Sequence, residues 1–281
     1  MKGDAMTKLL YLECTSGISG DMCAAALLDA GASEEAVRRA LESLPVEGFA
    51  VEISRVKKSG LDVCDFSVVL DAAHENHDHD MAYLHGHGGA SEHGHGHAHD
   101  HDHGHGAPGG HHHRGPAEIA EIIDGAAMTD GAKAIAHRMF GFVADAEARA
   151  HGVPVGEVHF HEVGAVDSIA DIIAIAVAAD DLAPDGVVVS DLPCGYGTVR
   201  CQHGLIPVPA PATAFIAEAA GLTLSPVDGE GELVTPTAAA ALRTESVLPE
   251  RFSIKAIGMG AGKRAYDTPG ILRAMIIEPA E

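Results

Sequence analysis

Few cysteines, few basic residues and no long apolar run set the first limits on this chain of 281 residues. The five cysteines are an odd number without a Cys-x-x-Cys pair, and the sequence shows no N-terminal apolar signal region. We therefore expect reduced thiols in the cytoplasm and no disulfide framework. No apolar run approaches the roughly 18 residues of a membrane-spanning helix, so we also expect no membrane partner.

Basic residues number 18 against 41 acidic ones, which gives a formal net charge of −23. A field of this sign repels a phosphate backbone, so the composition argues against a nucleic-acid partner and favours cations. The composition leaves the oligomeric state open, and a homo-oligomer is compatible with it.

Apolar residues make up 46% of the chain, and its length suits one or two globular domains. Helix and strand patterns alternate along most of it, which predicts an α/β fold in which a mixed sheet is covered by helices. We divide the chain into an αβ part with a glycine-rich loop (1–73), a histidine-rich insertion (74–115) and a second αβ part with a C-terminal glycine-rich hairpin (116–281).

A tract of histidines dominates the insertion. Between His74 and His113 the chain carries 15 of its 20 histidines, interleaved with Gly, Asp and Glu. Such a segment buries too little apolar surface to offset its chain entropy, so we expect it to be disordered without a ligand. Neutral imidazole is a preferred ligand of nickel, copper and zinc, which predicts transition-metal binding; a solvated linker is the alternative. The candidate ligands in the tract are His93, His95, His97, His99, His101, His103 and His105.

The segment 157–171 contains a second candidate metal site. If Glu157–His161 forms a strand, its period of two places His159 and His161 on one face, roughly 7 Å apart. We expect this strand to lie beside the strand Lys8–Cys14 in one sheet. Two adjacent imidazoles suit a metal ion, although such a pair is often only hydrogen-bonded.

The helix that follows this predicted strand carries carboxylates. Asp167 and Asp171 are spaced i,i+4 on the face opposite an apolar stripe, and Glu162 precedes them. Together with the two histidines they form a ligand set for a borderline or hard divalent cation. The alternative is that carboxylates on such a face are simply solvated.

A glycine-rich turn near the N-terminus is a candidate phosphate site. The turn Thr15–Asp21 opens a predicted helix over Met22–Ala30, where backbone N–H groups and the helix dipole attract an anion. The turn lacks the lysine and the glycine spacing of the usual nucleotide motifs. Asp21 would repel a bare phosphate, so we expect a cation to bridge the two; a helix capped by Ser19 is the alternative. The candidate contact residues are Ser16, Gly17 and Gly20.

A second glycine-rich loop joins the last two predicted strands. Gly260 and Gly262 would let the backbone approach a ligand, and Lys263 and Arg264 would hold an anion. A glycine-rich connection with solvated charges is the alternative.

Several blocks of the sequence carry a family resemblance. They are Tyr11–Cys14, Ser16–Met22, Val158–Ser168, Gly197–Cys201, His203–Gly204, Pro207–Thr213, Gly231–Thr237 and Gly260–Gly262. In composition and order these blocks resemble the nickel-insertion proteins of nickel-pincer cofactor synthesis, the LarC family. A histidine-rich insertion is also typical of that family.

The resemblance implies an activity. It implies a lyase-class nickel chelatase, or cyclometallase, that inserts Ni²⁺ into pyridinium-3,5-bisthiocarboxylic acid mononucleotide with Mg²⁺ or Mn²⁺ and CTP as helpers. One nickel–carbon and two nickel–sulfur bonds would form. Family members usually continue into a C-terminal domain associated with CTP, so a separately encoded domain would have to supply the nucleotide dependence here. A non-enzymatic nickel storage or delivery chaperone is the alternative.

The residues and the resemblance together suggest roles. The tract would capture Ni²⁺, the glycine-rich loops with Lys263 and Arg264 would hold the substrate phosphate, and a base would take the pyridinium C–H proton. The family motif does not by itself allot these roles. Our candidate catalytic residues are Asp21, Glu162 and Asp167, with a motif histidine as a further candidate base.

Overall fold

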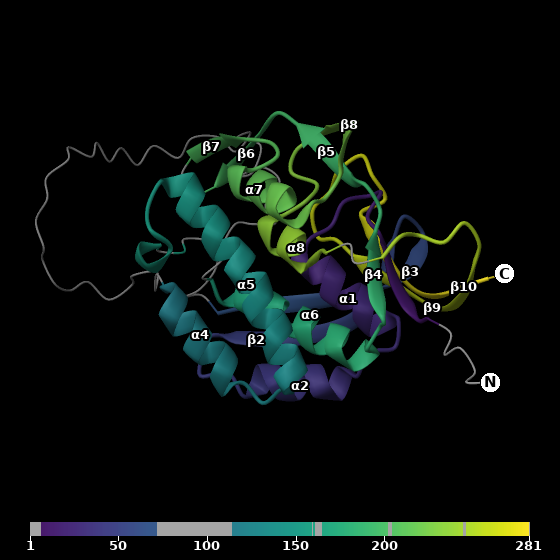
Figure 1. Cartoon of the computed structure of the whole chain (residues 1–281), viewed down its shortest axis with the longest axis horizontal. Coiled ribbons are helices and arrows are strands. Elements are labelled where there is room, and N and C mark those ends of the chain that lie inside the picture. The colour runs from purple at the N-terminus through teal and green to yellow at the C-terminus, as the bar shows by residue number, and fades with distance from the viewer. Residues whose placement is uncertain are drawn as a thin grey trace, which may run out of the picture.

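The computed structural model describes residues 7–71, 114–158, 160, 165–201, 204–243 and 246–280. Helices and strands alternate along this part of the chain (Figure 1). The strands are β1 (Leu9–Glu13), β2 (Phe49–Lys58), β3 (Leu61–Leu70), β4 (Gly186–Val189), β5 (Leu192–Tyr196), β6 (Thr198–Cys201), β7 (Gly204–Pro207), β8 (Leu224–Glu230), β9 (Phe252–Ala261) and β10 (Ile271–Pro279). The helices are α1 (Gly20–Asp29), α2 (Glu34–Glu42), α4 (Pro116–Gly125), α5 (Asp130–His151), the 3₁₀ helix η1 (Val155–Glu157), α6 (Val166–Leu182), α7 (Pro211–Ala220) and α8 (Pro236–Ala241). None of these described helices is long and apolar enough to cross a membrane.

Six strands form one mixed sheet in the order β2-β3-β9-β10-β1-β4. Strand β1 lies between β10, which is antiparallel to it, and β4, which is parallel to it. Strands from both sides of the histidine-rich tract therefore share this sheet. The predicted α/β class with a mixed sheet is confirmed, whereas the tract itself lies outside the described residues.

The helices form layers on the sheet. Helix α1 contacts β3, β9 and β10, and α6 contacts α1, α2 and α5, so α6 lies in the middle of the helical part (Figure 1). Because it is surrounded, most of its residues are buried, including Ile172, Ile173 and Ile175. The alternative of a solvated carboxylate face therefore does not hold at Asp171, which lies against Gly20 of α1.

Two glycines of β9 determine how closely α1 lies on the sheet. A Cβ atom at Gly258 would overlap the carbonyl oxygen of Ala26, and one at Gly260 would overlap that of Met22. Alternate residues face the same side of a strand, so glycine at both positions lets the helix backbone touch the strand backbone. The close approach that Gly260 permits is therefore to the backbone of α1.

The predicted strand Glu157–His161 does not form among the described residues. Glu157 is the last residue of η1 (Val155–Glu157), and Phe160 makes only an isolated bridge with Arg114. The neighbours of β1 are β10 and β4, so the expected pairing of this segment with β1 is wrong. Instead, the Phe160 ring packs edge-on against Phe140 of α5, with centroids 4.9 Å apart. Burial of an aromatic ring, rather than sheet pairing, holds this part of the segment.

Candidate active site

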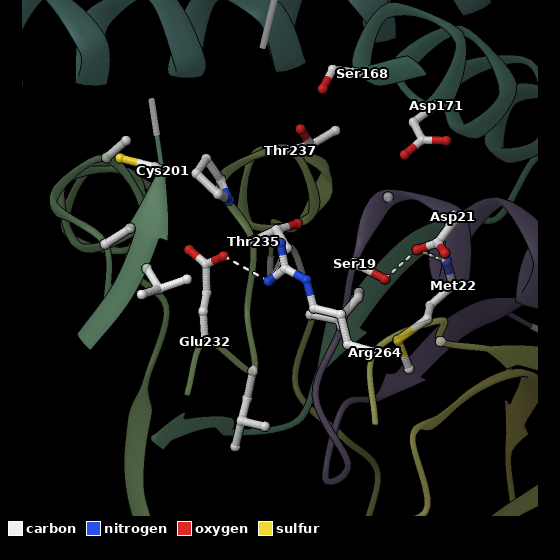
Figure 2. A pocket seen from close by; sticks show the side chains of 18 of the residues that line it. Ser19, Asp21, Met22, Ser168, Asp171, Cys201, Glu232, Thr235, Thr237 and Arg264 are labelled. Atoms are coloured by element: carbon white, nitrogen blue, oxygen red, sulfur yellow. Dashed lines mark hydrogen bonds and ion pairs between the residues drawn. The ribbon is translucent and has the colours of Figure 1, made fainter. Parts of the chain in front are cut away.

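A cavity of about 440 Å³ lies where the start of α1, the start of α6 and the loop after β9 meet. Its volume falls in the range of small-molecule sites. Figure 2 shows that side chains from α1, α6, β6 and the segment before α8 point into the same space. Segments that are far apart in the sequence therefore build one site.

The turn before α1 is tied to the segment before α8. The Ile18 N–H donates to the Leu233 carbonyl at 2.8 Å, and the Thr235 N–H donates to the Ile18 carbonyl at 3.2 Å. Gly17 has a φ of 96°, and a Cβ atom there would lie 2.6 Å from the Leu233 oxygen. Glycine meets both constraints because it has no Cβ and tolerates a positive φ. The turn thereby holds the start of α1 at the edge of the cavity.

Asp21 is a nearly buried carboxylate in the first turn of α1, with 6% of its surface exposed. Its Oδ1 accepts hydrogen bonds from the Ser19 hydroxyl and from the Met22 N–H, the latter at 2.9 Å (Figure 2). Ser19 makes no side-chain cap, so its hydroxyl serves Asp21 instead of the helix. Within the described residues the other oxygen, Oδ2, has no hydrogen-bond donor, and the Lys263 Nζ lies 4.0 Å from it.

Asp171 projects from α6 into the space above Asp21 (Figure 2). Its carboxyl group occupies the place that a side chain at Gly20 would need. Burial is the main reason why the pKa of Asp171 lies well above its usual range; the negative charges of Asp21 and Asp167 add to the shift, and Lys263 opposes it. Three carboxyl groups thus influence one corner of the cavity.

Two basic residues follow β9 and differ in their surroundings. The Arg264 Nη1 lies 2.9 Å from the Glu232 Oε2, and both side chains are largely buried. Burial raises the pKa of Tyr266, whose hydroxyl neighbours this ion pair. The Lys263 side chain is 21% exposed and lies near Asp21. Arg264 is therefore balanced by a protein carboxylate, whereas Lys263 belongs to the acidic corner.

A further part of the cavity wall comes from α5 and β6. The His151 Nε2 lies 3.3 Å from the Glu147 Oε2. Burial raises the pKa of Glu147, and the imidazole of His151 opposes this shift. Cys201 lies on the side of the cavity away from Asp21 (Figure 2). Among the residues that the structure describes, no three His, Cys, Asp or Glu side chains are placed to hold a metal ion together.

The cavity brings together many of the residues predicted from sequence. Gly17 and Gly260 do not line it, and their lack of a side chain serves chain packing instead. His159, His161, Glu162 and the tract histidines lie outside the described residues, so their roles stay predictions. The predicted residues that do line the cavity are Ser16, Gly20, Asp21, Asp167, Asp171, Gly262, Lys263 and Arg264.

Sequence reasoning placed Asp171 in the ligand set of a candidate cation site, but it selected neither Glu232 nor Glu147. A signal existed for Glu232, because it lies within a block that carries the family resemblance. Glu147 gave no signal, since it is one of several charged residues on a long helix. Only the packing of α5 places it at the cavity.

Known proteins resemble this chain over nearly its whole length. The family described as nickel insertion protein matches residues 10–281. The pyridinium-3,5-bisthiocarboxylic acid mononucleotide nickel insertion protein of Alkaliphilus metalliredigens (strain QYMF) is 47% identical over 278 residues, which cover 97% of this chain and 61% of that protein. The protein of the same description from Geobacillus kaustophilus (strain HTA426) is 37% identical over 276 residues, covering 96% of this chain and 60% of the relative.

The chain thus spans about three fifths of the length of these relatives. No solved structure matches it. Because the family match covers almost the entire sequence, this chain belongs to the nickel insertion protein family.

Proposed function

We propose that this chain inserts Ni²⁺ into pyridinium-3,5-bisthiocarboxylic acid mononucleotide, as the lyase-class part of a nickel insertion protein. The observation that carries the proposal is the cavity, where carboxylates of α1 and α6 adjoin a lysine in a chain of this family. The Alkaliphilus relative is named for this substrate. A cavity of about 440 Å³ suits a ligand of mononucleotide size.

The substrate phosphate would bind at the start of α1. The Lys263 side chain reaches this region, and Ser16 and Ser19 line the same part of the cavity. Helix α1 has ten residues, so its dipole adds positive potential at its N-terminal N–H groups. Arg264 is held by Glu232 and would position the loop that carries Lys263.

Nickel is the metal substrate of the proposed reaction. It is a borderline ion that favours imidazole and sulfur ligands. We propose that His159 and His161 receive it, and that Cys201, which lines the cavity, assists. The histidine-rich tract, including His93–His105, would raise the local nickel concentration.

Formation of the nickel–carbon bond requires a proton acceptor. The pyridinium C–H bond breaks, its electron pair forms the bond to nickel, and the proton passes to a base, while the two thiocarboxylates supply the nickel–sulfur bonds. Asp167 and Glu162 are the carboxylates that we propose for this step. Asp167 lies in the first turn of α6 and lines the cavity.

Two helpers complete the proposal. Mg²⁺ or Mn²⁺ would neutralise phosphate charge in the cavity, because hard cations prefer oxygen ligands such as carboxylate and phosphate. We assign no described residue to CTP. We propose instead that CTP acts through the part of the relatives that this chain does not span.

Mass spectrometry of the mononucleotide tests this function. The substrate is incubated with the chain, Ni²⁺, Mg²⁺ and CTP, with and without a separately supplied C-terminal domain. We expect the substrate mass to gain one nickel and lose protons, and we expect this change to fall at least tenfold in Lys263→Ala and Asp167→Asn. Lys57→Ala, whose side chain is 70% exposed, and Asp145→Asn on the surface of α5 are charge-matched controls. An unchanged substrate mass with the wild-type chain under all conditions contradicts the proposal.

Nickel storage or delivery is the second candidate, and the density of histidines between His74 and His113 favours it. Deletion of 74–113 separates the two, because the tract acts by local concentration and not by chemistry. An enzyme should lose most bound nickel but retain insertion at saturating free Ni²⁺. Loss of all nickel-dependent function even at saturation would identify a chaperone.

A further inference from the structure

The carboxylate of Asp21 is satisfied on one side only. Its Oδ1 accepts two hydrogen bonds, one from the Ser19 hydroxyl and one from the Met22 N–H. Its Oδ2 is buried and has no hydrogen-bond donor among the described residues, and only 8% of the side chain is exposed. Lys263 lies 4.0 Å from Oδ2, beyond hydrogen-bond range. A buried carboxylate oxygen in this state is costly unless a ligand completes it.

A second carboxyl group faces the same space from another element. Asp171 extends from α6 toward the start of α1, and both aspartates line the cavity (Figure 2). Gly20 is what makes this approach possible, because any side chain there would overlap the Asp171 carboxyl group. The fold therefore brings two carboxyl groups together at a position that a single methyl group would close.

The chemistry of the two groups indicates what they bind. Both offer carboxyl oxygens, and the Lys263 Nζ stays 4.0 Å from the Asp21 Oδ2. Arg264, the next cation along the chain, is engaged by Glu232. Carboxyl oxygens from two elements, around a buried oxygen that has no donor among the described residues, match a hard divalent cation.

We propose that Asp21 and Asp171 form a site for a hard divalent cation of the Mg²⁺ class, completed by water and by a phosphate oxygen of the bound mononucleotide. The described residues contain no three-ligand metal group. This agrees with the proposal because Mg²⁺ keeps several waters and is usually held by one or two carboxylates together with substrate phosphate.

This cation is distinct from the nickel that is inserted. All of its protein ligands are carboxylate oxygens, which suit hard ions, whereas nickel favours imidazole. Lys263 and the cation would bind one phosphate group from two sides. The bound mononucleotide should therefore tighten binding of the cation, and the bound cation should tighten binding of the mononucleotide. The role of the phosphate rests on the proposed function; the cation site itself does not.

Binding of Mn²⁺ to the full-length chain, followed by electron paramagnetic resonance without nickel, tests the site. Mn²⁺ is used because it resembles Mg²⁺ in ligand preference and is visible to the method. We expect Asp21→Asn and Asp171→Asn each to weaken one Mn²⁺ site at least tenfold. Asp145→Asn, which removes the same charge from an exposed position on α5, should leave that site unchanged. Any Mn²⁺ held by the histidine-rich tract is common to all four proteins.

Gly20→Ala is the sharper variant, because it keeps every charge and only displaces the Asp171 carboxyl group. It should also weaken the Mn²⁺ site at least tenfold. Circular dichroism and thermal melting show whether it is folded. Should it not fold, Asp171→Glu, which keeps the charge but lengthens the side chain, replaces it with the same expectation.

Addition of a pyridine mononucleotide, nicotinic acid mononucleotide, measures the link to phosphate. We expect it to tighten Mn²⁺ binding severalfold in the wild type and not in Asp171→Asn. Unchanged Mn²⁺ binding in both aspartate variants, or an equal loss in Asp145→Asn, would overturn the site. The Mn²⁺ experiment contains no nickel, so its result does not depend on nickel insertion. A chain that binds Mn²⁺ at this site but does not insert nickel would refute only the proposed function. A chain that inserts nickel but lacks this Mn²⁺ site would refute only the inference.

Discussion

Two acidic centres of the cavity differ in how their charge is balanced. Glu232 has a direct ion pair, since the Arg264 Nη1 lies 2.9 Å from its Oε2. Asp21 and Asp171 face Lys263, whose Nζ lies 4.0 Å from the Asp21 Oδ2. The ion pair of the first centre forms within the folded chain, and it joins the segment before α8 to the loop after β9. In the second centre the buried Asp21 Oδ2 has no hydrogen-bond donor among the described residues, so it is the place where a ligand gains most.

The largest effect is expected from breaking the balanced centre. Glu232→Gln should lower the free energy of unfolding by about 3–5 kcal/mol, because it leaves the largely buried Arg264 without its charge partner. Urea denaturation measures this loss. Glu218→Gln, which breaks an exposed ion pair with Arg149, should cost about 1 kcal/mol or less. Equal losses in the two variants would mean that the Glu232 pair contributes no more than a surface pair.

A smaller effect is expected from displacing α1, the helix that carries Asp21. Gly260→Ala places a methyl group against the Met22 carbonyl and should lower the free energy of unfolding by about 1–3 kcal/mol. Gly141→Ala is the matched control, since its Cβ would meet open space on helix α5. That change should stabilise the protein by about 0.5–1 kcal/mol. A neutral Gly260→Ala would show that α1 does not depend on this close contact.

The smallest effect is expected from neutralising Asp171, and its sign is opposite. Burial, Asp21 and Asp167 raise the pKa of this carboxyl group, and Lys263 opposes the shift; among the described residues Cys23 is a further titratable neighbour. The folded chain therefore holds a proton that the unfolded chain releases above its ordinary pKa of 3.8. Wild-type stability should fall as the pH rises from there through the raised pKa.

Asp171→Asn removes this dependence. Without divalent metal and at neutral pH, it should be more stable than the wild type by on the order of 1 kcal/mol, and the gain should vanish below pH 4. Urea denaturation in chelator across a pH series measures the difference. A variant that is less stable than the wild type at neutral pH would show that the carboxylate is already balanced within the protein.

Local patterns account for much of the framework. Ser33 and Thr235 are helix caps, Gly152 ends α5 in a left-handed conformation, and Pro211 begins α7, all as expected from their neighbours in sequence. The antiparallel pair β2–β3 was also predictable, because both strands alternate and a short turn joins them. These features depend on residues a few positions apart.

Distant contacts decided the points at which the sequence left two environments open. Residues near Phe160 read as a strand by alternation, but an aromatic contact with α5 holds them instead. Gly260 read as a ligand contact, yet its partner is the backbone of Met22. In both cases the local pattern was compatible with two environments, and only packing chose between them.

The sequence by itself determined the α/β class, the family and the residue types of the site: a carboxylate at the start of α1, carboxylates on α6, and a lysine after β9. Tertiary structure decided which carboxyl groups lie close together. Asp21 and Asp171 are 150 residues apart in the chain, and the missing side chain of Gly20 is what lets them face one cavity. Charge balance depends on such distances in space, and a sequence records only distances along the chain.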